Sequence, residues 1–211
     1  MSNWCMTTIK IYNENKVKLE ELEKSLNKWT SKNYMDNDFG KNWLGNIVIG
    51  AGLGIVSQDK KELITNLDCY GSLCYMELDE NCLWIETETA WKPMFQLWLK
   101  LLEKYLPDGE IIYYAKEIGN AIYCSNDTQY KDLYCVQFED IDNISKIIGY
   151  DIEDFMDTNE ISKMDLRKCL QLLLDTDEYD MDTLIELTTT KYDEDDIYIL
   201  KCKYIEPKEL D

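Results

Sequence analysis

Carboxylates are the groups through which this chain could do chemistry. Its 211 residues include 42 Asp and Glu against 22 Lys and Arg, with a formal net charge of −20 at pH 7, and there is no histidine. The missing histidine removes Ser-His-Asp and Cys-His catalysis and the commonest general acid and base near neutral pH. We therefore predict that the protein is not an enzyme.

The acidic residues gather toward the C-terminus, where residues 139–196 hold 19 acids and 5 bases. Apolar positions interleave with the acids, so the pattern predicts a folded acidic surface and not a disordered tail. Such a surface favours a basic partner. The candidate partner-binding residues form two runs: Asp175, Asp177, Glu178, Asp180 and Asp182 in the first, and Asp193, Glu194, Asp195 and Asp196 in the second.

The acids do not complete a known metal motif. Residues 175–186 place carboxylates at several EF-hand positions, but Tyr179 and Asp180 stand where that loop needs an oxygen ligand and a glycine. The stretch PDGEIIYYAK lacks the acid two residues before Lys116 that a PD…(D/E)xK nuclease would carry. The eight cysteines include no CxxC pair, which favours reduced core thiols. We expect no metal ion and no cofactor.

A glycine-rich stretch, VIGAGLG, has part of a dinucleotide-binding pattern. The third glycine of GxGxxG would fall at position 55, where the chain has Ile55, and no βαβ unit surrounds the stretch. A small-molecule or nucleotide-binding or processing role for the Gly45–Gly54 segment nevertheless stays open as the alternative function.

Six tryptophans and fifteen tyrosines offer platforms on which bases of single-stranded nucleic acid could stack. Most of them fall at core positions, and Arg167 is the single arginine, so we expect no basic groove and no direct binding of nucleic acid. Trp4, Trp43 and Trp91 lie at the ends of predicted elements. We expect these three to be partly exposed and take them as the alternative partner-binding residues.

The elements that position these residues are organised around residues 72–125. Period-2 alternation before and after Glu80-Asn81 predicts a hairpin. The spacing of apolar residues within 89–107 predicts a helix, with Pro93 near its first turn and Pro107-Asp108-Gly109 ending it. A second hairpin follows, with its turn at Gly119-Asn120. Upstream, MTTIKIY is typical of a strand and residues 14–29 of a helix, with Asn13 as its predicted cap.

This order, β-α-β-β-α-β, is the split arrangement of ferredoxin-like domains. The sequence therefore predicts an α+β protein, with a ferredoxin-like antiparallel sheet and two helices, plus an acidic C-terminal α/β extension. We place the ferredoxin-like domain at residues 1–138, with a Gly-rich insertion over 36–71, and the extension, packed on it, at 139–211. In the extension we predict a short helix ending at Gly149, an amphipathic helix over 164–175, and a closing hairpin of residues 184–192 and 197–205.

Several segments resemble a known family. These are the opening NWC, the middle NWLGNIV and LDCYGSL, and above all TETAWKPMFQLWLKLLEKY followed by IIYYAKEIGNAIYCS. Over residues 2–138 the chain resembles the YubB-type ferredoxin-like proteins carried by phages and plasmids. The resemblance implies a ferredoxin-like fold and an origin on a mobile element, and it supplies no catalytic residues.

No run of about 18 apolar residues exists to span a bilayer, and the N-terminus lacks the parts of a signal peptide. We expect a cytoplasmic protein of the host bacterial cell, without membrane contact. Its expected role is to bind and inhibit a host defence complex of the anti-CRISPR or anti-restriction type. The expected partner is a host protein with a basic nucleic-acid-binding surface, because the acidic surface of this chain would mimic nucleic acid. An accessory phage protein is a further alternative. The oligomeric state and the independent folding of residues 139–211 stay open.

Overall fold

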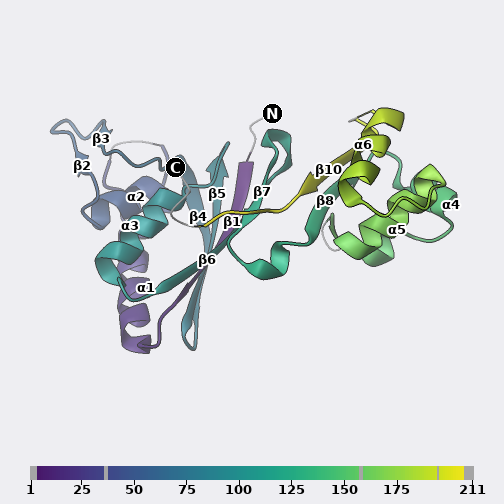
Figure 1. Cartoon of the computed structure of the whole chain (residues 1–211). Coiled ribbons are helices and arrows are strands. Elements are labelled where there is room, and N and C mark those ends of the chain that lie inside the picture. The colour runs from purple at the N-terminus through teal and green to yellow at the C-terminus, as the bar shows by residue number, and fades with distance from the viewer. Residues whose placement is uncertain (1–3, 36–37, 157–158, 194, 207–211) are drawn as a thin grey trace. The chain divides into compact units, whose positions relative to one another are not determined.

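The structure is a computed structural model that describes residues 4–35, 38–156, 159–193 and 195–206 (Figure 1). Contacts divide the chain into two compact units, which we call the first unit (residues 1–127 and 205–211) and the second unit (residues 128–204). The second unit is thus inserted into the first along the chain. The chain is of the predicted α+β class.

The first unit holds five strands of a six-stranded, mostly antiparallel sheet, with the strand order β11-β7-β6-β1-β5-β4. The sixth strand, β11, is formed by the last two residues of the range 128–204. Helices cover one face of this sheet (Figure 1). The strands are β1 (Trp4–Tyr12), β4 (Gly71–Asp79), β5 (Cys82–Ala90), β6 (Glu110–Glu117), β7 (Ile122–Ser125) and β11 (Lys203–Tyr204). The helices are α1 (Lys16–Thr30), α2 (Leu44–Gly50), α3 (Phe95–Tyr105) and the 3-10 turn η1 (Ile118–Asn120).

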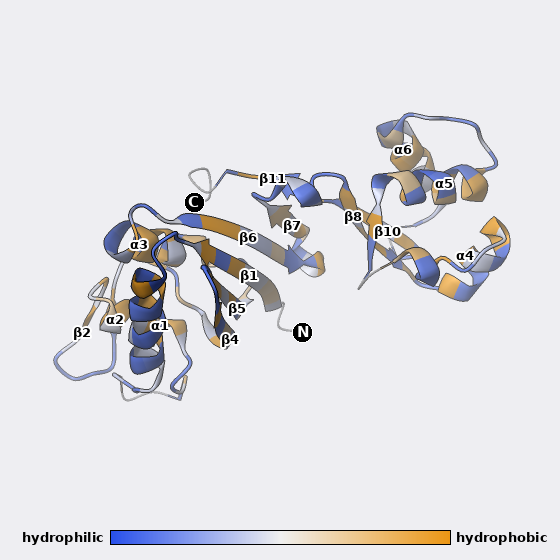
Figure 2. Ribbon diagram, turned by 90° about the horizontal axis from the view of Figure 1, so that it is seen from below, coloured by the Kyte–Doolittle hydropathy of each residue, from blue (hydrophilic) through white to orange (hydrophobic). Residues whose placement is uncertain are grey.

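The core of the first unit lies between these helices and the sheet. The predicted apolar stripe of α1 is buried there, together with the inward residues of α3 and of the central strands. Burying each such side chain contributes about 1.5–3 kcal/mol. Inward and outward residues alternate along the strands, and Figure 2 shows this as changes of colour along β6. Both predicted hairpins and both predicted helices of this unit are confirmed.

The cap of α1 differs from the prediction. Asn15 is the N-cap, and its side chain accepts a hydrogen bond from the Val17 N–H at 3.1 Å. The side chain of Asn13 accepts instead from the Asn15 N–H at 2.8 Å. Asn13 therefore shapes the turn that brings Asn15 to the helix start.

The predicted Gly-rich insertion contains regular structure, although residues 36 and 37 lie outside the described residues. It holds α2 and a small hairpin of β2 (Ile55–Val56) and β3 (Leu63–Ile64). Two of its glycines serve close packing, because a Cβ on Gly45 would lie 2.3 Å from the Trp43 ring and one on Gly50 would lie 2.2 Å from the Trp29 ring.

The second unit has a three-stranded sheet, in the order β10-β8-β9, with its own apolar core. Its strands are β8 (Leu133–Phe138), β9 (Glu160–Ser162) and β10 (Ile197–Lys201), and its helices are α4 (Ile141–Ile148), α5 (Lys163–Leu174), α6 (Met181–Lys191) and the 3-10 turns η2 (Thr128–Tyr130) and η3 (Glu153–Phe155). As predicted, α4 ends at Gly149 and the apolar side of α5 is buried. Because β8 pairs with β9 and β10, it belongs to this unit, whereas we had placed residues up to 138 in the first domain.

The predicted closing hairpin is wrong. Residues 181–191 form helix α6, and β10 pairs with β8. Met181, Leu184 and Thr188 are buried at helical spacing, and the Thr188 hydroxyl donates to the Leu184 carbonyl at 2.8 Å. Burial of this stripe outweighs the strand preference of the threonine run.

Across the described ranges, no helix combines the length and the apolar character needed to cross a bilayer. No disulfide joins the cysteines, and six of the eight are buried.

Candidate functional site

Four acids of the first run, Asp175, Asp177, Glu178 and Asp180, lie in the loop that joins α5 to α6, and Asp182 lies in α6 itself. Asp175 follows the last residue of α5, Asp180 is the N-cap of α6, and Asp182 lies in its first turn. Between them, the Glu178 carboxylate accepts hydrogen bonds from the N–H groups of Tyr179 at 2.7 Å and of Asp180 at 2.9 Å. These carboxylates are therefore held by helix ends and backbone hydrogen bonds.

The second acidic run lies at the other end of α6, in the turn that leads to β10. Asp193, Asp195 and Asp196 are exposed there, whereas Glu194 lies outside the described residues. An 11-residue helix separates the two runs, which is a length of about 16 Å. The structure thus places the two runs at opposite ends of one helix and does not merge them.

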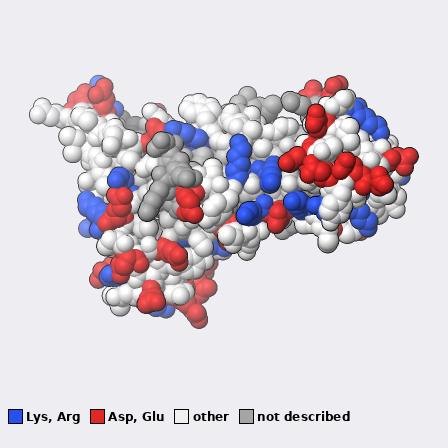
Figure 3. Space-filling model, in the orientation of Figure 1, with Lys and Arg blue, Asp and Glu red and all other residues white. Residues whose placement is uncertain are grey.

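Within the described ranges, none of the remaining eight candidate carboxylates forms a salt bridge. The four ion pairs found within 4.0 Å join other residues, such as Lys18 with Asp108 and Lys92 with Asp68. Seven of the eight are exposed, and Glu178 is half-buried. Figure 3 shows acidic side chains gathered on the visible face of the second unit, with basic ones at their margins.

Arg167 lies near the first acidic run but stacks on a ring. Its guanidinium carbon is 4.0 Å from the centroid of the Tyr179 ring. The cation of the single arginine is thereby directed to an aromatic face, a contact worth about 0.5–1 kcal/mol at exposed sites.

Two of the three candidate tryptophans are exposed, Trp4 by 47% and Trp91 by 63%. Trp4 pairs with Ala90 in the β1–β5 register, and Trp91 directly follows Ala90. Trp4 and Trp91 therefore lie at the same end of this strand pair. Trp43 is an error of prediction, because it is buried at 6% exposure and its ring packs on Phe39 with centroids 4.9 Å apart. Gly45 permits this burial by leaving room for the ring.

The face of the first unit's sheet that carries no helix is a feature that the sequence analysis missed. Trp4, Met6, Tyr75 and Trp84 are exposed on it, at alternate positions of β1, β4 and β5. The signal is present in the period-2 pattern, but the prediction that most tryptophans and tyrosines lie in the core hid it, and Trp84 is 36% exposed.

A polar cavity of about 730 Å³ lies at the start of α1. It combines amide, carboxylate and phenol groups from three separate segments: Tyr12, Asn13, Glu14 and Asn15, then Asn81, and then Asp108, Gly109 and Glu110. Because these segments are far apart in the sequence, no local pattern predicted the cavity.

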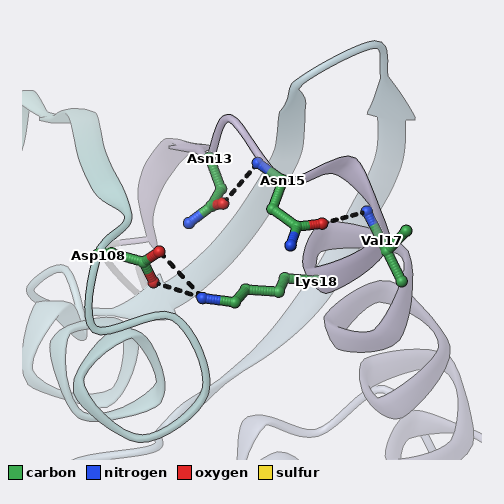
Figure 4. A network of polar contacts seen from close by, with 5 residues as sticks. All are labelled: Asn13, Asn15, Val17, Lys18 and Asp108. Atoms are coloured by element: carbon green, nitrogen blue, oxygen red, sulfur yellow. Dashed lines mark hydrogen bonds and ion pairs between the residues drawn. The ribbon is translucent and has the colours of Figure 1, made fainter.

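Asn13 and Asp108 face each other at this cavity (Figure 4). The Lys18 ammonium donates to both Asp108 carboxylate oxygens at 2.9 Å, and this hydrogen bond is the main cause that lowers the pKa of Asp108 below its usual 3.8. Asn13 is 6% exposed, and its amide nitrogen is directed toward Asp108 and also helps to lower the pKa of that carboxyl.

Among the described residues, no group of three or more Cys, Asp or Glu side chains is arranged to hold a metal ion. Comparisons of the chain with protein-family models, curated proteins and solved structures found no match.

Proposed function

We propose that this protein is a non-enzymatic protein of a phage or other mobile element, which binds and inhibits a host defence complex of the anti-CRISPR or anti-restriction type. The observation that carries the proposal is the set of candidate carboxylates at the two ends of α6 that have no cationic partner within 4.0 Å in the described chain. Unneutralised carboxylates on a folded support attract a basic surface and steer its approach.

The arrangement of the acids supports mimicry of nucleic acid. The two runs are separated by about 16 Å along α6, which is about five steps of 3.4 Å along one DNA strand. The partner is then a host protein whose basic surface normally holds phosphates. In this proposal the protein acts in the cytoplasm of the host bacterium and binds no nucleic acid itself.

Asp175 adds an energetic argument. It follows the C-terminal end of α5 in the left-handed conformation, with φ 52°, and the last turn of α5 carries no base. A negative charge at the negative end of a helix dipole is unfavourable, and the left-handed conformation favours glycine or asparagine. An aspartate here costs stability, and binding of a basic partner is a function that offsets this cost.

We also propose the ferredoxin-like topology for the first unit, and with it the kinship to YubB-type proteins. The strand order β6-β1-β5-β4, with α1 between β1 and β4 and α3 between β5 and β6, supports this proposal.

The test uses the full chain as bait in a lysate of the host. We compare the native protein with a variant in which the first run is neutralised by Asp175→Asn, Asp177→Asn, Glu178→Gln, Asp180→Asn and Asp182→Asn. The matched control neutralises five acids of the first unit by Glu21→Gln, Asp38→Asn, Glu62→Gln, Asp68→Asn and Glu103→Gln. We expect the native and control proteins to recover the same basic partner and the variant to lose it, with recovery falling as salt rises. Equal recovery by all three would contradict the proposal.

A second candidate function is binding of a small polar molecule in the cavity at the start of α1. The observation that favours it is the cavity itself, where the buried Asn13 amide and the Asp108 carboxylate lie side by side. In the Gly45–Gly54 segment, α2 covers residues up to Gly50, and Gly45 and Gly50 pack against tryptophan rings, so we place this alternative at the cavity instead. The carboxylates of Glu14, Asp108 and Glu110 repel phosphates, so the cavity suits hydroxyl groups, such as those of a nucleoside or sugar.

An NMR titration with nucleosides, nucleotides and sugars tests this candidate. We expect a neutral hydroxyl-bearing ligand to shift the Asn13 side-chain signals, and Asn13→Leu to abolish binding, while Asn66→Ala, an exposed change elsewhere, leaves it intact. Absence of a shift with every ligand would exclude the candidate.

A further inference from the structure

Four residues on the helix-free face of the first unit's sheet form a regular arrangement, which we call the aromatic–glutamate square: Tyr75 and Glu77 of β4, and Trp84 and Glu86 of β5. Across the strand pair, Tyr75 lies opposite Glu86 and Glu77 lies opposite Trp84. Along each strand, the aromatic residue donates a hydrogen bond to the glutamate two residues on. The Trp84 Nε1–H donates to Glu86 Oε1 at 3.2 Å, and the Tyr75 hydroxyl donates to Glu77 Oε2.

These hydrogen bonds hold the two glutamates in place and use one oxygen of each. In the described chain, Glu77 Oε1 and Glu86 Oε2 accept no hydrogen bond. The hydrogen bond to Glu77 also raises the pKa of Tyr75, so the phenol keeps its proton and remains a donor. Each carboxylate is thus oriented and still has an oxygen available for an incoming donor.

The square attracts cations, and the protein itself shows one such contact. Lys10 on β1 lies opposite Trp84, with its ammonium 4.4 Å from the centroid of the ring. Tyr75 is 45% exposed and Trp84 36%, so ring surface remains accessible. Lys10 is the one basic residue on the outward positions of β1, β4 and β5, which also carry Glu77, Glu86 and Glu88. The local charge is therefore negative.

We propose that the aromatic–glutamate square is an interaction surface that binds an arginine-bearing peptide segment of a protein partner. A guanidinium is planar, stacks on aromatic rings and donates two parallel hydrogen bonds to a carboxylate, so it uses both components of the square. Phosphates are repelled by the glutamates, which excludes nucleic acid as the occupant. This inference goes beyond the proposed function, because it does not require the acids around α6.

The test is an NMR titration of the full chain, followed on the indole N–H signal of Trp84, which is assigned by its loss in Trp84→Phe. The probes are three synthetic peptides that alternate glycine with arginine, with lysine or with citrulline, the neutral analogue of arginine. We expect the arginine peptide to shift the Trp84 signal, the lysine peptide to bind more weakly, and the citrulline peptide to have no effect.

Two variants make the result specific. Glu77→Gln with Glu86→Gln should weaken binding of the arginine peptide about tenfold or more, because charge-assisted hydrogen bonds are lost. Glu21→Gln with Glu62→Gln, which removes two exposed charges outside the square and outside the two acidic runs, should leave the Trp84 shift unchanged. Because the exchanged residues are on the surface, both variants should match the native thermal unfolding curve.

Two results would overturn the proposal. One is a Trp84 signal that no peptide shifts, or that the citrulline peptide shifts equally. The other is a Trp84 signal that changes with protein concentration alone, because a second copy of the chain would then cover the face. Either result leaves the pull-down test of the proposed function unaffected.

Discussion

The Asp180 carboxylate holds the start of α6 by accepting hydrogen bonds from both the backbone N–H and the hydroxyl of Thr183, each at 2.9 Å. Asp180 is thus a helix cap as well as a candidate partner-binding residue. Its two roles make different demands, because capping needs a side-chain oxygen and partner binding needs the charge.

Substitutions at position 180 separate these roles. Asp180→Ala removes the cap, so we expect the midpoint of urea unfolding to fall. Asp180→Asn keeps a capping oxygen and should stay close to the native midpoint, although it removes the charge. If the two variants unfolded at the same urea concentration, the cap would not contribute to stability.

The same contact predicts a dependence on pH. Hydrogen bonds from the Thr183 backbone and side chain lower the pKa of Asp180 below its ordinary value of 3.8. A carboxylate whose pKa is lower in the folded protein stabilises it above the unfolded pKa, and this contribution is lost as the pH falls through the folded pKa. Below pH 3.8 the native protein should therefore lose stability relative to Asp180→Asn, because the carboxylate becomes protonated. From pH 5 to pH 7 the difference in the free energy of unfolding between the two proteins should stay constant. Urea unfolding at pH 7, pH 5 and pH 3 measures it.

Asp175 should be a site where substitution stabilises the protein. Its φ of 52° suits glycine, and its charge opposes the dipole of α5. We expect Asp175→Gly to raise the free energy of unfolding by about 0.5–1 kcal/mol. The control is Asp177→Gly, where φ is not positive, so glycine relieves no strain. Because glycine also increases the conformational entropy of the unfolded chain, the free energy of unfolding of this variant should not rise. A loss of stability in Asp175→Gly would contradict the strain argument.

The cysteines should differ sharply in reactivity. Burial raises the pKa of Cys5 and of Cys69 to about 11 and that of Cys169 to about 12, whereas Cys74 is exposed. Since the thiolate is the reactive form, iodoacetamide should label Cys74 first in the folded protein and all eight cysteines in urea. Mass spectrometry of the labelled peptides measures this order, and Cys74→Ser should remove the fast phase.

The first unit should fold without the second. The Ile205 N–H donates to the Ser125 carbonyl at 3.1 Å, so the two ends that flank the second unit lie side by side. We expect a chain in which a short Gly-Ser linker joins residues 127 and 205 to give a dispersed NMR spectrum. A fragment of residues 1–138 should be less stable, because it lacks Ile205, whose carbonyl accepts a hydrogen bond from the Tyr113 hydroxyl at 2.5 Å. An unfolded linked chain would mean that the two units fold only together.

Elements whose signals are local can be predicted from the sequence alone. The hairpin of β4 and β5 follows from alternation on both sides of a polar turn, and α1, α3 and α5 follow from apolar residues three and four apart. Neighbouring residues along the chain carry these patterns, so they are visible without knowledge of the fold.

Features that depend on residues far apart in the sequence become visible only in the folded protein. The threonine run of α6 prefers a strand, but the Asp180 cap and the burial of Leu184 in the apolar core of the second unit make it a helix. The aromatic–glutamate square joins residues 75 and 86 through strand register, and the polar cavity joins residues 13 and 108. Local propensities are worth less than about 1 kcal/mol per residue, whereas burying one large side chain is worth more, so packing settles such cases.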